Sequence, residues 1–240
     1  MTNTEFRTGV ISPVECVKEG FERIKRDYWL LFAISLVGGL IGGFTMYILL
    51  GAMLCGIYYA CLKAIDGKPV EFDDLWKGMN YFGPSLVVIL IAIVPTFAVY
   101  IFVYLTFVAA IVAGAQAGQA GLIGSLVVIG LIDLAIVIAM ICFHTLLTFS
   151  FPLIVDRNLG AVDAIKTSAR AVWGNLGGVV GLVVVNMVLM FLGGAACGIG
   201  MYFVMPIMMA GNAAAYRRVF PPLVAQPNMS PPPPSSYNWS

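Results

Sequence analysis

The stretch YWLLFAISLVGGLIGGFTMYILLGAMLCGIYYACLKAI, Tyr28 to Ile65, contains a single charged residue, Lys63. As one continuous helix it would be ~57 Å long, far more than the ~30 Å of a bilayer's hydrocarbon core. We therefore expect a hairpin of two membrane-crossing helices. The break is expected near Gly38 to Phe44, where four glycines weaken the helix and leave the backbone free to turn.

The composition of the whole chain agrees with a membrane location. Of its 240 residues, 60% are hydrophobic and 10% are charged, and the mean hydropathy is +0.95. Soluble domains average roughly 45–50% apolar and 25% charged residues. The uncharged runs are too long and unbroken for the strands of a membrane barrel, so the expected fold class is all-α. A net charge of +1 without a basic, aromatic-rich patch argues against nucleic acid as a partner.

Two further hairpins are expected later in the chain. The second has arms at Gly83 to Ala113 and Leu122 to Ser150, joined by the uncharged GAQAGQAG. The third runs from Leu176 to Tyr216 and breaks near LGGAACG. The prediction is therefore a polytopic membrane protein with six transmembrane helices arranged as three hairpins.

An amphipathic segment precedes each hairpin: Ser12 to Asp27, Phe72 to Asn80 and Gly160 to Asn175. The first begins with Ser12-Pro13-Val14-Glu15, which predicts a helix start with Ser12 as N-cap and Glu15 completing a capping box. Apolar residues recur every three or four positions in these segments, with basic residues on other faces. We expect three helices lying flat on the cytoplasmic membrane surface.

The Lys and Arg residues predict the orientation. In the six-span arrangement all thirteen fall on one side of the membrane, which the positive-inside rule assigns to the cytoplasm. Both termini are then cytoplasmic. The predicted organisation is a cytoplasmic segment over 1–27, a membrane domain over 28–219 and a disordered Pro-rich cytoplasmic tail over 220–240. The tail is either free in solvent or bound to a cytoplasmic protein partner.

Matching segments indicate an internal repeat. VECVK, Val14 to Lys18, resembles VDAIK, Val162 to Lys166. Further matches share one offset: Gly38-Gly39, Met46-Tyr47, Gly56 and Lys63 correspond to Gly193-Gly194, Met201-Tyr202, Gly211 and Arg218. Units that start and end inside are parallel repeats, related by an axis along the membrane normal. Glycine pairs four residues apart favour close helix packing within the chain, and a homodimer face is the alternative.

Four polar residues within the predicted spans are the candidate intramembrane site: Asp133, His144, Asn186 and Asn212. An ionisable group in hydrocarbon costs roughly 2.5–3.5 kcal/mol and usually faces other helices. Asp133 could titrate along a proton or cation path, with His144 as a relay and the two asparagines as polar partners. The alternative is that these residues serve packing alone. The five cysteines lack metal-site spacing, and we predict no catalytic residues, metal, disulfide or cofactor.

Two segments, VEFDDLWKGMNYF and FPLIVDRNLGAVDAIKTSARAVWGN, carry a resemblance to a known group. The chain resembles bacterial six-helix membrane proteins of unknown function, similar to the membrane domain fused to some glycerophosphodiester phosphodiesterases. The resemblance covers Ser12 to Val219. It implies fold and membrane location without an activity, and the phosphodiesterase barrel with its metal ligands is missing here.

The sequence leaves two functions open. The first is a non-enzymatic integral inner-membrane protein that serves as a scaffold or interaction platform for partners or anionic lipid at the cytoplasmic surface. The alternative is a small transporter or channel with Asp133 as its titrating group. Because transport needs a continuous polar lining and the chain supplies few polar residues for one, we expect the platform.

Overall fold

The computed structural model describes residues 5–116, 118–195 and 198–222, and all of their secondary structure is helical. The all-α prediction is confirmed for these residues. Of the disordered tail predicted over 220–240, residues 223–240 lie outside them, as does Cys197. The prediction is wrong for Phe220, which is buried and packs its ring against Tyr216 and Phe149. The elements are α1 (Pro13–Ile24), α2 (Tyr28–Phe44), α3 (Leu50–Ile65), the 3-10 helix η1 (Phe72–Tyr81), α4 (Phe82–Gln116), α5 (Gly118–Leu146), α6 (Ser150–Arg157), α7 (Ala161–Gly174), α8 (Leu176–Ala195) and α9 (Gly200–Val219).

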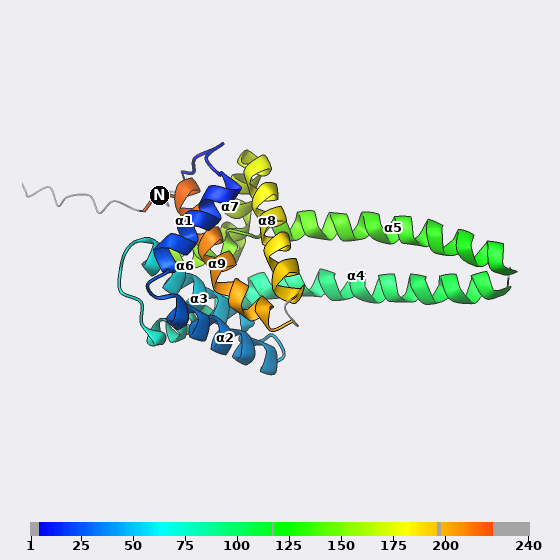
Figure 1. Ribbon diagram of the computed structural model, residues 1–240, viewed down its shortest axis with the longest axis horizontal. Coiled ribbons are helices and arrows are strands. Elements are labelled where there is room, and N and C mark those ends of the chain that lie inside the picture. The colour runs from blue at the N-terminus through cyan, green and yellow to red at the C-terminus, as the bar shows by residue number, and fades with distance from the viewer. Residues whose placement is uncertain (1–4, 117, 196–197, 223–240) are drawn as a thin grey trace, which may run out of the picture.

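The helices form two parts (Figure 1). The long helices α4 and α5 pair as an antiparallel arm that projects from the rest of the molecule. The other helices pack together as a base. With 35 and 29 residues, α4 and α5 are roughly 52 and 44 Å long. The arm is apolar on all sides, and most of its side chains are exposed.

Three helical segments are long and apolar enough to cross a membrane: Phe72–Gly114, Ala120–Arg157 and Leu176–Ala195. A fourth is counted if α1 and α2, which meet at 104°, form one broken span. This is fewer than the six spans predicted. The 16 residues of α3 cover only ~24 Å, and α9 ends in Arg217 and Arg218.

The first hairpin turns later than predicted. Helix α2 continues through the glycine-rich stretch to Phe44, and the chain reverses at Met46 and Tyr47, whose φ values of 49° and 68° are left-handed. The Thr45 hydroxyl stabilises this end by donating to the Ile41 carbonyl at 2.8 Å. The reversal therefore falls just after the glycine-rich stretch near which the break was predicted, and within that stretch Gly42 packs closely against Leu50 of the returning helix.

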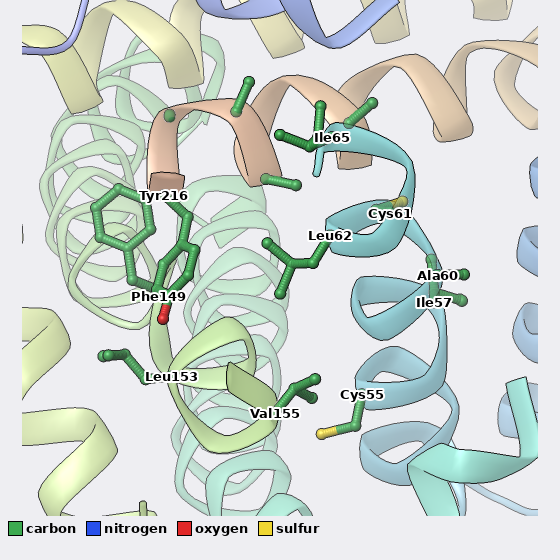
Figure 2. Packing of buried hydrophobic residues seen from close by; sticks show 14 of the residues in the cluster. Cys55, Ile57, Ala60, Cys61, Leu62, Ile65, Phe149, Leu153, Val155 and Tyr216 are labelled. Carbon is green, nitrogen blue, oxygen red and sulfur yellow. The ribbon is translucent and has the colours of Figure 1, made fainter. Parts of the chain in front are cut away.

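The core of the base surrounds α3, where 12 of 16 residues are buried. Leu62 points from α3 toward Tyr216 at the end of α9, and Leu153 of α6 lies nearby (Figure 2). The rings of Tyr216 and Phe149 are 6.2 Å apart. Helix α6, which supplies part of this core, was not predicted from the sequence.

Two of the amphipathic helices pack against the base. Helix α1 buries Cys16, Gly20 and Ile24, and a Cβ at Gly20 would lie 2.7 Å from the backbone of Ala210 in α9. Likewise, a Cβ at Gly56 in α3 would collide with the Leu75 carbonyl oxygen of η1.

One face of each helix is therefore used for protein contact. Placement of their exposed apolar side chains in the membrane interface stays a prediction. The start of α1 lies where it was predicted, with Ser12 at the N-cap and Pro13 in the first helical turn. The Ser12 side chain, however, makes no cap hydrogen bond.

The hairpin helices contact one another in a closed order. Within hairpins α2 contacts α3, α4 contacts α5 and α8 contacts α9. Between hairpins α3 contacts α4, α5 contacts α8 and α9 contacts α2, and α3 also contacts α9 across this order. The short helix before each hairpin also contacts the second arm of another hairpin, in the pairs α1 with α9, η1 with α3 and α7 with α5.

Candidate functional site

Asp133 lies on α5 at the seam between the two helices of the arm. The Thr106 hydroxyl of α4 is 3.2 Å from its Oδ1 and 3.4 Å from its Oδ2. Both residues are half-buried. The carboxyl group therefore faces the neighbouring helix, and its hydrogen bond joins α4 to α5 away from the ends of both helices.

His144 lies on the same face of α5, nearer the base. Its Nδ1 is 2.9 Å from the Met140 carbonyl oxygen, and its Nε2 is 3.3 Å from the Thr96 hydroxyl of α4. A carbonyl oxygen only accepts hydrogen bonds, so Nδ1 carries a proton. The ring is exposed and borders an open cavity of about 500 Å³ lined by α4, α5 and α8.

Asn186 and Asn212 form a separate pair between α8 and α9. The Asn186 Nδ2 donates to the Asn212 Oδ1 at 3.0 Å, and Asn212 also hydrogen-bonds the Tyr58 side chain of α3. The Asn186 Oδ1 is buried without a partner among the described residues. Among those residues no hydrogen bond links either asparagine to Asp133.

The four predicted residues are thus divided among three separate pairs: Asp133 with Thr106, His144 with Thr96, and Asn186 with Asn212. Between Asp133 and His144 the cavity is lined mainly by apolar residues, among them Val103, Val137 and Met140, and Tyr100 adds a hydroxyl. A proton or cation path needs polar groups or water at successive points along its length. Transport through this site stays a prediction. No contact between these pairs of residues supports it.

Arg217 and Arg218 at the end of α9 are each the centre of a cluster of charged side chains in the base. From the sequence these arginines predicted only the orientation. Arg217 binds Asp66 of α3 with two hydrogen bonds of 2.9 and 2.8 Å and binds Asp156 of α6 at 2.8 Å. Arg218 pairs with Glu15 and Glu19 of α1 at 3.2 and 2.9 Å. The end of α9 is therefore tied to three other helices.

Asp74 of η1 is the centre of another cluster. Its side chain is fully buried and accepts hydrogen bonds from Lys63 of α3 at 2.8 Å and from Lys77 at 2.7 Å. It also accepts one from the backbone of Glu71, which completes a capping box at the start of η1. Burial disfavours the charged carboxylate, but the hydrogen bonds from Lys63 and Lys77 outweigh it and lower the pKa of Asp74.

The outer faces of α1 and α7 carry similar stripes of exposed residues. On α1 the stripe combines Val14 and Phe21 with lysines, and on α7 it combines Val162 and Trp173 with basic residues. The members recur every three or four positions, so they lie on one side of each helix. The full sets are Val14, Lys18, Phe21 and Lys25 on α1, and Val162, Lys166, Arg170 and Trp173 on α7.

Among the residues that the structure describes, no group of three or more His, Cys, Asp or Glu side chains is placed to hold a metal ion. Comparisons of the chain with protein-family models, curated proteins and solved structures find no match.

Proposed function

We propose that the chain is a multi-pass inner-membrane protein whose base forms a non-enzymatic scaffold at the cytoplasmic surface. The observation that carries the proposal is the pair of mixed apolar and basic stripes on α1 and α7. Such faces suit a protein partner, because an exposed apolar patch ringed by polar residues marks an interaction site. The charged groups beneath them hold helices together: Arg217 and Arg218 each bind two carboxylates on other helices.

For the topology we propose six spans, formed by three hairpins that enter the membrane from one side. The closed order of contacts around the hairpins supports parallel repeats. So do the matched residues Gly56 and Gly211, which receive η1 and α1 respectively. The Arg7 backbone N–H donates to the Val219 carbonyl at 2.9 Å, so the two ends of the helical part lie together. An even number of crossings agrees with this contact.

Single cysteines test the topology. The native cysteines would be replaced by Ala or Ser, and new ones placed at Gln116 near the tip of the arm and at exposed Glu22 of α1. An impermeant thiol reagent added to intact cells should label Gln116→Cys and leave Glu22→Cys unlabelled. Lysed cells provide the control in which both label. Labelling of Glu22→Cys in intact cells would overturn the orientation.

The scaffold role can be tested by photocrosslinking in cells. A photoreactive amino acid at Val162 or Trp173 of α7 should give one discrete protein adduct. The same amino acid at Val128 on the arm, 58% exposed, should give lipid adducts alone. The protein adduct should disappear with Lys166→Glu and Arg170→Glu, which reverse the charge of the stripe. A stripe that crosslinks only lipid, or an adduct that survives charge reversal, contradicts the proposal.

A further inference from the structure

The cavity at the root of the arm has the size of a ligand site. Its volume of about 500 Å³ lies within the roughly 300–1,000 Å³ common for small-molecule pockets. Helices α4 and α5 form two of its walls, and Val183 and Met187 of α8 contribute a third. The cavity therefore lies where the arm leaves the base.

Polarity changes along the length of this cavity. At the end nearest the base it is lined by Thr96, His144, Thr145 and Thr148. Toward the tip of the arm the lining becomes Val99, Tyr100, Val103 and Val137, which is apolar apart from the Tyr100 hydroxyl. Because α4 and α5 run antiparallel, Thr96 and His144 meet at the same end, as their 3.3 Å contact shows. A molecule with one polar end and one apolar chain matches this gradient.

The polar end offers hydrogen-bond acceptors. Each threonine hydroxyl donates its proton to a backbone carbonyl at 2.7 Å: Thr96 to Ala92, Thr145 to Ile141 and Thr148 to Thr145. Their oxygen lone pairs remain. With the proton of His144 on Nδ1, the neutral ring presents Nε2 as another acceptor. A ligand head group that donates a hydrogen bond fits, whereas an anion would face lone pairs.

We propose that this cavity binds a single-chain amphiphile with a hydroxyl head group. The hydroxyl donates to His144 Nε2, and the chain lies along Val99, Val103 and Val137 between the arm and α8. The site is independent of the scaffold role and of the direction in which the chain crosses the membrane.

The test uses the full-length protein purified in detergent and three diazirine probes of equal chain length: a long-chain alcohol, its methyl ether and the corresponding fatty acid. The alcohol should label peptides of α4, α5 and α8, and should bind roughly fivefold more tightly than the ether, the value of one hydrogen bond. His144→Phe should remove the preference for the alcohol while chain binding persists.

A variant whose larger side chain fills the cavity provides the second part of the test. Val103→Trp should abolish labelling by all three probes, and the matched control Val128→Trp, on the exposed surface of the arm, should not. Size-exclusion chromatography checks that both variants fold. Equal affinity for alcohol and ether, a preference for the fatty acid, or labelling that survives Val103→Trp would overturn the proposal and indicate only a coat of bulk lipid or detergent.

Discussion

Helices α3 and α5 are both apolar and both contain glycine, yet their surroundings differ completely. In α3, a Cβ at Gly51 would lie 2.7 Å from the Ser85 carbonyl oxygen, and one at Gly56 would collide with Leu75. In α5, Gly124 and Gly130 have nothing within 4 Å. Within its most apolar stretch, no residue of α5 is buried in the protein. A glycine in an apolar helix therefore indicates close packing only where the backbone of another element lies against it, and most of the arm's apolar side chains stay exposed.

The largest effect should come from adding one methyl group to the base. Gly56→Ala places a Cβ against the Leu75 carbonyl, so α3 and η1 must separate, and we expect a loss of at least ~3 kcal/mol in the free energy of unfolding. The matched change Gly130→Ala on the arm should be neutral or stabilise by up to ~1 kcal/mol. Unfolding by SDS titration of both variants in mixed micelles measures the difference. Equal losses would contradict the distinction between base and arm.

Removal of a carboxylate charge should also destabilise the base more than the arm, by a smaller free energy than the glycine substitutions. Asp74→Asn removes the charge between Lys63 and Lys77, and we expect it to cost about 2 kcal/mol, since Lys77 is partly exposed and screened. Asp133→Asn keeps the shape and the hydrogen bond to Thr106, and should change stability by less than ~1 kcal/mol. Thermal unfolding in detergent compares the two. If Asp133→Asn proves the more damaging, the carboxyl group of the arm has a role beyond joining α4 to α5.

Asp74 also predicts a dependence on pH. Its pKa is lowered from 3.8 in the folded base, so its stabilising contribution is present above that value and is lost as the pH falls through the lower folded pKa. The wild type should therefore lose stability below about pH 4, and Asp74→Asn should flatten that part of the curve. Melting temperatures between pH 3 and 6 test this. Identical slopes for the two proteins would show that other carboxylates dominate.

The smallest effect should come from the arm's own hydrogen bond. Thr106→Val leaves Asp133 without its hydroxyl partner, and hydrogen bonds between membrane helices average only ~0.6 kcal/mol. The variant should therefore remain folded, with a loss near that size in SDS titration. A double-mutant cycle with Asp133→Asn isolates the pair. A coupling above ~2 kcal/mol would mean that the seam contributes more than lipid-facing helices usually do.

The sequence predicted helix positions well where charge and glycine mark a boundary. The helix at Ala161–Gly174 and the pair of long arms agree with expectation, because each is delimited by polar or glycine-rich residues. Hydropathy could not reveal that α3 is buried by other helices of the protein and that α5 is left exposed, since both helices are apolar. It also missed α6, because Phe151 to Val155 reads as a continuation of the preceding apolar run.

The candidate site was predictable as a set of residues and unpredictable as an arrangement. Asp133 and His144 lie eleven positions apart on one helix, so a shared face followed from the helical repeat. Their partners Thr106 and Thr96 depend on the register of α4 against α5, which no single residue specifies. Asn186 and Asn212 were expected to be polar partners within the membrane, but their pairing with each other required the packing of α8 on α9.

The contact between α1 and α9 has a consequence for biosynthesis. Glu19 and Arg218, which it joins, are 199 residues apart. At roughly 5–20 residues per second, a ribosome needs about 10–40 s to make the intervening chain. Throughout that interval the face of α1 with Cys16, Gly20 and Ile24 has been synthesised and its partner helix has not. The contact between α1 and α9 can therefore form only after the ribosome has made α9.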